Sequence, residues 1–346
     1  MSPATVGAMT QTIVVNRRKR RADRMVAEKK MTRSRLVQVA LGLILFALTG
    51  FFFAREFSKN WEGIKATAFA LNLPLLVSSF ILIVLSYLVN TKAWCRGINL
   101  YSPLRPFSFS DGIGMVNTTQ LTKYIPGKVW GYAMQVVLVD RKSVPPANVI
   151  YINLFIAISN VFVSAVMGTA YLLFVPSVVP LSVSAALFSL SALGYASFLI
   201  FNGKFVRLVL RLAELILRRT ISPCEIPVGT MLALQGYSLL NVALFGCSAV
   251  LCAAGLGFAV SAPFGIALAI GSILADAVGF IMIFAPGGIG IREGLLYLLL
   301  RAQGPGIAAL TVPVALRIVS MLVDVALGLT GLMFLRRYAN AKRGER

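Results

Sequence analysis

The sequence predicts an all-α polytopic membrane protein with about six full transmembrane helices and two oppositely oriented re-entrant helical hairpins, arranged as an inverted-topology internal repeat. The first observation is composition, because 58% of the 346 residues are hydrophobic and the mean hydropathy is positive. The second is a helix-breaking aromatic-x-Pro-Gly pattern at residues 124–127 that recurs at 284–287, an offset of 160 residues. Such a composition is typical of chains whose apolar surface faces lipid.

The same offset extends beyond the two breaks. It aligns Arg141 with Arg301 and Pro145 with Pro305, and an apolar run follows each proline. We interpret the match as an internal duplication. Pro-Gly pairs at corresponding points of two halves indicate broken helices and a substrate site near the bilayer midplane.

Basic residues are concentrated at segment ends and in the two tails. The formal net charge is +21, and residues 1–35 alone carry ten Lys or Arg. A second basic tail occupies residues 338–346, after a single transmembrane domain at 36–337. The positive-inside rule places both tails in the cytoplasm, so topology explains the charge and no nucleic-acid partner is expected.

Full spans are predicted from apolar length. The six stretches are 36–53, 71–89, 147–175, 179–201, 228–256 and 306–335. The first is long and has no small-x-small cleavage site after it, so we expect it to remain as a span. Residues 204–219 combine basic and apolar side chains and are expected to form an amphipathic helix on the cytoplasmic surface.

The two breaks predict the re-entrant hairpins, near 124–131 and near 284–294. Residues 107–140 are too polar for a lipid-facing span and have basic flanks on both sides, which predicts a hairpin that enters and leaves at the cytoplasmic face. Three full spans separate the breaks, so the second hairpin must enter from the opposite face. A full crossing by 263–284 is the alternative, but 294–300 would then be too short to recross roughly 30 Å of hydrocarbon.

Two segments carry a resemblance to a known family. Gln120-Leu-Thr-Lys-Tyr-Ile-Pro-Gly-Lys-Val-Trp130 and Pro286-Gly-Gly-Ile-Gly-Ile-Arg-Glu-Gly294 resemble signature segments of the lysylphosphatidylglycerol synthase transmembrane-region family. In its two-domain members this region is the flippase half, and a cytosolic domain transfers lysine from its tRNA to phosphatidylglycerol. The chain stops at Arg346, so the resemblance implies a stand-alone member without that aminoacylation activity. Stand-alone members look like transporters of, or helpers for, lipid-linked sugars and other phosphate-bearing lipids.

Residues around the breaks are the predicted headgroup site. A broken helix places unpaired N–H groups and partial positive charge inside the membrane, where a phosphate is the natural ligand. Lys128 and Arg292 are expected to hold that phosphate, and Glu293 is expected to orient Arg292. A purely interfacial ion pair of Arg292 and Glu293 is the alternative. The full substrate-binding set is Gln120, Lys123, Tyr124, Lys128, Trp130, Gly287, Gly288, Gly290, Arg292 and Glu293.

Three other ionisable residues, Asp276, Arg317 and Asp324, lie within apolar runs. An unpaired charge at the bilayer centre costs roughly 2.5 to 3.5 kcal/mol, so these side chains should face the interior. Arg317 and Asp324 are seven residues apart on one helix face, so each is expected to bridge to the opposite half. A structural role and a coupling role remain open for them. Interhelical hydrogen bonds are predicted for three uncharged side chains, Asn160, Gln235 and Asn241.

The predicted function is a membrane lipid translocase. Its substrate would be an anionic or phosphate-bearing lipid, such as a polyprenyl-phosphate-linked sugar or a modified phospholipid, with the headgroup between the hairpins. No enzyme activity, metal or cofactor is expected, because the chain has no histidine, no metal-type cysteine spacing and no Walker loop. The alternatives are a non-catalytic accessory subunit of a membrane glycosyltransferase or lipid-modifying enzyme, and a transporter of a small soluble anion.

The predicted surroundings follow from the same interpretation. The chain is expected in the plasma membrane as a multi-pass protein with both termini in the cytoplasm. Its expected partners are the lipid substrate, the membrane, a membrane glycosyltransferase or synthase, and a second copy of the chain in a homodimer.

Overall fold

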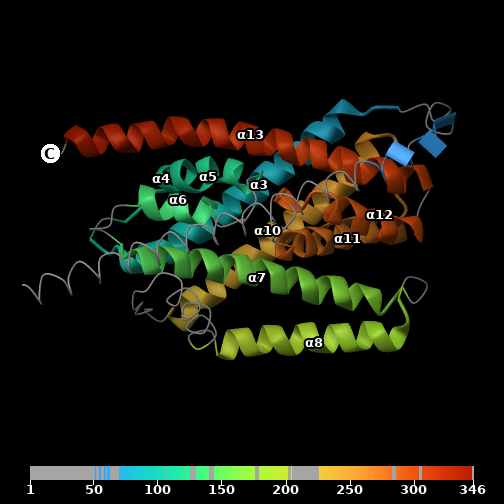
Figure 1. Cartoon of the computed structure of the whole chain (residues 1–346), viewed down its shortest axis with the longest axis horizontal. Helices are drawn as coiled ribbons and strands as arrows, with labels where there is room; N and C mark the ends of the chain where they lie inside the picture. Colours follow the sequence, from blue (N-terminus) through green and yellow to red (C-terminus); the bar gives the residue numbers. More distant parts are fainter. Residues whose placement is uncertain are drawn as a thin grey trace, which may run out of the picture.

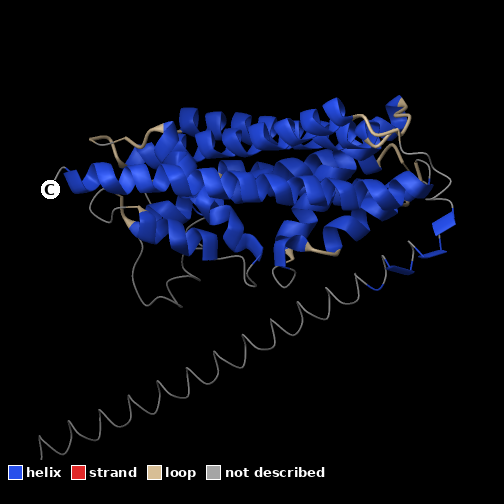
Figure 2. Ribbon diagram, turned by 90° about the horizontal axis from the view of Figure 1, so that it is seen from above, coloured by secondary structure: helices blue, strands red, loops and turns tan. Residues whose placement is uncertain are grey.

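In the computed structural model the long helices run roughly along one axis, and every regular element of the described chain is a helix (Figures 1 and 2). The structure describes residues 70–104, 106–124, 130–139, 144–175, 179–201, 226–282, 286–303 and 306–344, with scattered positions between 51 and 62 and residue 204. Several predicted features lie outside these residues. They are the basic tail at 1–35, the first span apart from residue 51, the amphipathic segment after Lys204 and the break at Pro126-Gly127.

Seven helices form the body of the molecule. They are α3 (Leu73–Ile98), α7 (Pro146–Leu172), α8 (Leu181–Ile200), α10 (Val228–Gly255), α11 (Ala262–Ile281), α12 (Ile291–Arg301) and α13 (Gly306–Gly344). Proline stands in the first turn of α3, α7 and α11, where its missing N–H leaves no hydrogen bond unmade. Helix α13 runs through most of the basic tail predicted at 338–346.

Short elements fill the two broken regions. The first region, between α3 and α7, contains η1 (Asn99–Tyr101), α4 (Phe109–Gly112), the π-helix η2 (Ile113–Asn117), α5 (Thr118–Gln120), η3 (Leu121–Tyr124) and α6 (Trp130–Leu138). In the second, η4 (Pro286–Gly288) separates α11 from α12. We call α4 to α6 the first broken segment and α11 to α12 the second.

The order of elements repeats along the chain. Each half has a long helix, a broken segment and a second long helix: α3, α4–α6 and α7, then α10, α11–α12 and α13. Helix α7 begins at Pro146 and α13 at Gly306, an offset of 160 residues. Helices α6 and α12 begin at Trp130 and Ile291, an offset of 161. The helix starts therefore follow the duplication predicted from the sequence.

The two halves interlock. The second broken segment packs through α11 on α7 of the first half, and the first packs through η2 and α5 on α13 of the second half. Figure 1 shows α4 to α6 toward one end of the bundle and α11 and α12 toward the other. The breaks themselves meet, because η3 contacts η4. The inverted repeat itself, with the broken segments entering from opposite membrane faces, stays a prediction.

Six helices of the described ranges are long and apolar enough to cross a membrane. Five correspond to predicted spans. The sixth is α11, which the sequence analysis assigned to a re-entrant arm; its 20 residues reach about 30 Å. Helix α12 has only 11 residues, about 16 Å, so α11 and α12 cannot both cross. The re-entrant character of this pair stays a prediction.

Glycines bring the first broken segment against α13 at backbone distance. A Cβ at Gly331 would lie 2.7 Å from the Thr118 nitrogen, and a Cβ at Gly114 would lie 2.9 Å from the Leu335 nitrogen. No side chain separates the two backbones at these points. Helix α13 consequently fixes the position of η3, which carries Lys123.

We expect Gly331→Ala to lower the free energy of unfolding by about 1–3 kcal/mol, because the new methyl group would collide with backbone atoms that cannot rotate away. Thermal unfolding in detergent measures the effect. Gly236→Ala is the matched control, since nothing lies within 4 Å of its Cβ position inside α10. Ala at that site should leave stability unchanged or raise it by up to about 1 kcal/mol. Equal effects of the two substitutions would contradict the packing argument.

Candidate functional site

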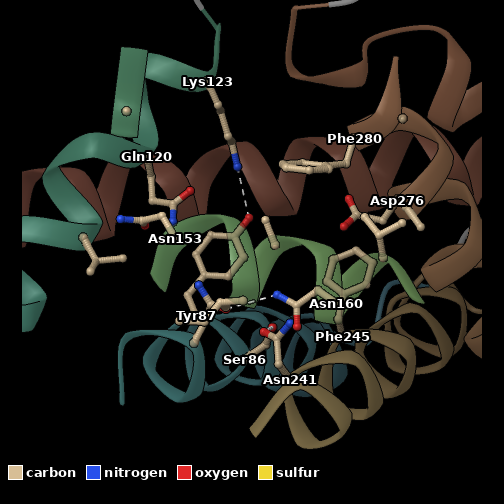
Figure 3. Close-up of a pocket in the computed structure, with 18 of the residues that line it drawn as sticks. Ser86, Tyr87, Gln120, Lys123, Asn153, Asn160, Asn241, Phe245, Asp276 and Phe280 are labelled. Carbon is tan, nitrogen blue, oxygen red and sulfur yellow. Dashed lines mark hydrogen bonds between the residues drawn. The ribbon is translucent and has the colours of Figure 1, made fainter. Parts of the chain in front are cut away.

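A cavity of about 260 Å³ lies between the two broken segments, with walls from α3, α7, α10 and α13 (Figure 3). This space equals the liquid volume of roughly nine water molecules, which is too large for a packing defect. Two apolar cores meet at its walls: Trp94 and Ile156 belong to one, Phe245 and Ile273 to the other. The cavity therefore sits where the two halves join.

Uncharged polar groups and aromatic rings line most of the cavity. The polar residues are Ser86, Asn90, Thr119, Gln120, Thr122, Gln135, Asn153, Asn160, Ser164 and Asn241, and the aromatic residues are Tyr87, Trp94, Tyr132, Phe245 and Phe280. The Asn160 amide donates to Asn90 Oδ1 at 3.1 Å, and Ser86 Oγ donates to Asn241 Oδ1 at 2.8 Å. Gln235 Nε2, elsewhere on α10, donates to Ser159 of α7. The predicted interhelical hydrogen bonds are confirmed.

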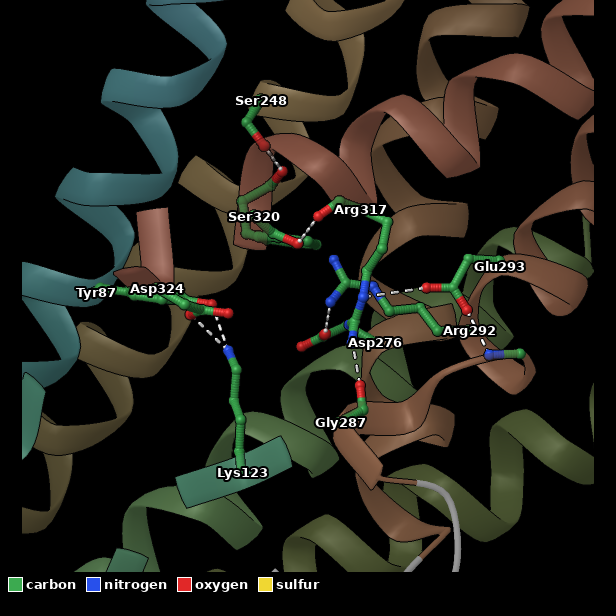
Figure 4. Close-up of polar contacts among 12 residues, drawn as sticks. Tyr87, Lys123, Ser248, Asp276, Gly287, Arg292, Glu293, Arg317, Ser320 and Asp324 are labelled. Carbon is green, nitrogen blue, oxygen red and sulfur yellow. Dashed lines mark hydrogen bonds and ion pairs between the residues drawn. The ribbon is translucent and has the colours of Figure 1, made fainter. Parts of the chain in front are cut away.

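Three ion pairs stand around the cavity (Figure 4). They join Lys123 to Asp324, Arg292 to Asp276 and Arg317 to Glu293. In these pairs of described residues each cation faces a carboxylate, which is how charged groups are accommodated inside an apolar bundle. A ligand phosphate must therefore displace a carboxylate from a cation or add to a cation that keeps a donor available.

The Lys123–Asp324 pair links the two halves. Lys123 Nζ lies 2.6 Å from Asp324 Oδ1 and donates to the Tyr87 hydroxyl at 3.1 Å. The Asp324 side chain is 1% exposed, whereas that of Lys123 is 29% exposed. Lys123 comes from the first break and Asp324 from α13, so this bridge crosses between halves as the sequence analysis expected for Asp324.

The Arg292–Asp276 pair is open on one side. Arg292 Nη1 lies 2.8 Å from Asp276 Oδ1, and the guanidinium stands 4.9 Å from the centre of the Phe245 ring. The Asp276 side chain is 52% exposed, while that of Arg292 is 10% exposed. Arg292 Nη2 is buried and has no hydrogen-bond partner among the described residues. The Arg292 guanidinium thus has one amino group without a partner among the described residues, and it pairs with the Asp276 carboxylate, which solvent or a ligand can reach.

Glu293 does not pair with Arg292, and this corrects the sequence analysis. Adjacent helical residues point in different directions, so their side chains do not face one another. Glu293 Oε1 instead lies 3.5 Å from Arg317 Nε, and Glu293 Oε2 accepts from the Gly290 N–H at 2.6 Å, which caps α12. Arg317 Nη1 also donates to the Gly287 carbonyl at 3.0 Å. This bridge from Arg317 to Glu293 lies within the second half, and a bridge from Arg317 to the opposite half stays a prediction.

The second break depends on glycine. Gly287, Gly288 and Gly290 have φ of 59°, 71° and 91°, values that side chains other than glycine rarely adopt. A Cβ at Gly288 would also lie 3.0 Å from the Gly279 carbonyl oxygen. These glycines explain why the chain can turn from α11 into α12 at this point. The turn places Arg292, the second residue of α12, in the wall of the cavity.

We expect Gly290→Ala to lower the free energy of unfolding by about 1–3 kcal/mol, because alanine would be strained at φ 91°. Thermal unfolding in detergent measures this. Gly294→Ala, one turn along the same helix, has nothing within 4 Å of its Cβ position and should be harmless. If both variants unfold at the wild-type temperature, the backbone of the turn is not constrained as described.

The structure brings together only part of the predicted substrate-binding set. Gln120, Lys123, Gly287 and Arg292 line the cavity, as do Asp276 and Arg317. Trp130 is 40% exposed and is not among the cavity residues. Lys128 and the side chain of Tyr124 lie outside the described residues.

Sequence reasoning missed most of the side chains that α3, α7 and α10 contribute to the cavity, and it named Asn160 and Asn241 only as interhelical hydrogen-bonding groups. Tyr87, Asn90 and Asn153 were not singled out, and Phe245 was taken for ordinary apolar sequence. One signal was present: Asn153 and Asn160 are seven residues apart, so they share one face of an otherwise apolar helix. A polar stripe on a span indicates a polar interior.

A protein-family model described as the lysylphosphatidylglycerol synthase TM region matches residues 36–328. The chain belongs to this family. The matched range includes both breaks, every residue that lines the cavity and all three ion pairs. The resemblance inferred from the two break segments is therefore confirmed, and the family is one of multi-pass membrane domains. No curated protein matches the chain at a significant level.

Proposed function

We propose that the protein is a translocase that moves a lipid with a phosphate-bearing headgroup between the leaflets of the membrane. The observation that carries this proposal is the polar cavity between the two broken segments. Its lining includes Arg292, whose buried Nη2 has no hydrogen-bond partner among the described residues, next to the half-exposed carboxylate of Asp276. Membership of a membrane family linked to lipids supports it. The cavity binds and releases the headgroup, and no covalent step is assigned to it.

Arg292 is the group we assign to the phosphate. A guanidinium binds phosphate through two parallel N–H donors, and Arg292 already uses one amino group on Asp276. A phosphate that enters the cavity accepts the hydrogen bonds of the Arg292 guanidinium, and the Asp276 side chain turns toward solvent. The N-terminal end of α12 adds partial positive charge near Arg292, the second residue of that helix.

Amide groups suit the rest of the headgroup. Asn90, Asn153, Asn160 and Asn241 offer both donors and acceptors, and they carry no charge that would favour an ammonium group. The hydroxyl groups of a sugar or glycerol headgroup can both donate to and accept from these amides. This favours a polyprenyl-phosphate-linked sugar or a hydroxylated modified phospholipid as the substrate.

The membrane orientation follows from the distribution of basic residues. Figure 1 places the end of α13 at the same end of the bundle as the start of α7 and the end of α8. Lys92 and Arg96 lie in the last two turns of α3, Lys204 follows α8, and Arg336 lies in the last third of α13. We assign the side of the bundle where these helices end to the cytoplasm of the plasma membrane. The end of α13 then lies inside the cell, and the predicted span at 36–53 would place the N-terminus there as well.

Reconstitution of the purified chain into vesicles tests the proposal. Fluorescent phosphatidylglycerol and a fluorescent polyprenyl-phosphate-linked sugar serve as probes, and a fluorescent glycolipid without phosphate is the control. Quenching from outside measures how much probe changes leaflet. We expect movement of a phosphate-bearing probe above empty vesicles and no added movement of the phosphate-free control. Absence of movement, with a glycosyltransferase or synthase co-purifying from the native membrane, would instead support an accessory subunit.

A further inference from the structure

A second hollow, an apolar groove, lies on the α7–α11 side of the molecule. Residues 167–175 at the C-terminal end of α7 form one wall, residues 262–270 at the start of α11 form the other, and Gln303 lies at its rim. Its volume is about 620 Å³, and Phe174 and Ile266 on its edges are 83% and 50% exposed. The lining is almost entirely apolar, in contrast to the central cavity.

The groove continues the line of the central cavity along the same two helices. On α7 the cavity residues Asn160 and Ser164 are followed by the groove residues Met167 and Tyr171, at spacings of three or four. Such spacings keep side chains on one face of a helix. On α11 the cavity residue Ile273 is followed in the same way by the groove residues Ile270 and Ile266. We call the contact line between α7 and α11 the seam. The seam is lined by polar α7 side chains beside the cavity, and it is apolar at the groove, where α7 ends and α11 begins.

Helices α7 and α11 are in close contact at the boundary between the polar cavity and the apolar groove. A Cβ at Gly168 of α7 would lie 2.7 Å from Leu274 Cδ1 of α11 and 2.8 Å from its Cβ. The two helices thus touch between cavity and groove. A polar headgroup can pass this point only when α7 and α11 separate, but each hollow can hold a different part of one molecule.

We propose that the groove between α7 and α11 holds a hydrocarbon chain of the lipid whose headgroup occupies the central cavity. This inference rests on the proposed function, because it requires a bound lipid. The apolar lining fits an acyl or isoprenoid chain. The groove lies next to the cavity along the same two helices, so a chain in the groove and a headgroup in the cavity can belong to one lipid once the contact between α7 and α11 at Gly168 opens.

The energetics make the proposal distinguishable from ordinary lipid contact. A chain that leaves the bilayer for the groove exchanges one apolar environment for another, so the hydrophobic effect contributes little. Stable occupancy must then come from the headgroup, through Arg292. A bulk membrane lipid resting on the groove has no such dependence.

Photocrosslinking tests the inference. The probe is phosphatidylglycerol with a photoactivatable diazirine on its acyl chain, added to the full-length protein in vesicles, with labelled peptides mapped by mass spectrometry. We expect residues 167–175 and 262–270 to be labelled at least fivefold more than the exposed face of α8. Arg292→Ala should reduce groove labelling to the level of α8. Arg301→Ala, an exposed arginine on the same helix, should leave it unchanged.

A second pair of variants fills the groove directly. Ala170→Trp places a large ring in the groove and should remove the labelling of residues 262–270 without changing the unfolding temperature. Ala186→Trp, at an exposed position on α8, is the matched control and should have no effect on groove labelling. Labelling that persists in Ala170→Trp contradicts the assignment of the groove.

The outcomes separate the tail site from the proposed function. Uniform labelling along α7, α8 and α11, or groove labelling that survives Arg292→Ala, would show bulk lipid only and overturn the inference. If leaflet transfer is nonetheless lost in Arg292→Ala, the translocase proposal stands without this tail path. If no probe changes leaflet but groove labelling requires Arg292, the tail site is supported and the translocase proposal fails.

Discussion

Arg292→Ala is expected to abolish leaflet transfer while the protein stays folded. Truncating a buried charged donor that binds a ligand charge costs about 2–5 kcal/mol, which corresponds to a loss of headgroup affinity of roughly 30-fold or more. Stability should change little, because the partner left behind, Asp276, is 52% exposed and can be solvated. The rate of probe movement in vesicles and the unfolding temperature in detergent are the two measurements.

Two matched variants sharpen this test. Arg292→Lys keeps the charge but loses the planar fork of donors, so transfer should fall and not vanish. Arg301→Ala removes a second arginine from the same helix, at an exposed position, and should transfer lipid like the wild type. Full lipid transfer by Arg292→Ala, or an equal loss of transfer in Arg301→Ala, would contradict the assignment of Arg292 to the headgroup phosphate.

Lys123→Met is expected to destabilise the protein by about 3–5 kcal/mol. Its ammonium lies 2.6 Å from Asp324, whose side chain is 1% exposed. Removing the Lys123 ammonium takes away a close positive charge from a buried carboxylate, and that cost greatly exceeds the net worth of an intact pair. Thermal unfolding in detergent measures the loss.

A double-mutant cycle identifies the cause. Lys123→Met combined with Asp324→Leu removes both charges, so the double variant should regain much of the stability that Lys123→Met loses. The positions contact each other across the two halves, and a large coupling is therefore expected. Simple addition of the two single effects would mean that the bridge does not join the halves.

The sequence was sufficient for the all-helical fold and for most of the long helices of the described chain. Apolar length predicted five of the six long helices, and the 160-residue offset predicted that the helices beginning at Pro146 and Gly306 correspond. These features depend on the local composition and on the spacing of the two repeats, and both can be read directly from the sequence. The treatment of α11 was less secure, because 20 apolar residues suit a span and a re-entrant arm equally.

The pairing of charges could not be predicted in full. Partners on different helices depend on how each helix is rotated, and this is set by packing; Gly331 and Gly114, for example, decide where α13 meets the first broken segment. Adjacency in sequence gave the wrong partner for Arg292, since Asp276 reaches it from α11. The asparagines that line the cavity were not recognised as a binding surface for a related reason: single polar residues on spans also serve as interhelical hydrogen-bonding groups.

Native mass spectrometry with lipid identification tests the central claim most directly. The wild-type protein, Arg292→Ala and Arg301→Ala are extracted in mild detergent under the same conditions, and the lipids that remain bound are identified. The account predicts one class of phosphate-bearing lipid on the wild type and on Arg301→Ala, and its loss from Arg292→Ala. The same bound lipids on all three proteins would contradict a headgroup site at Arg292.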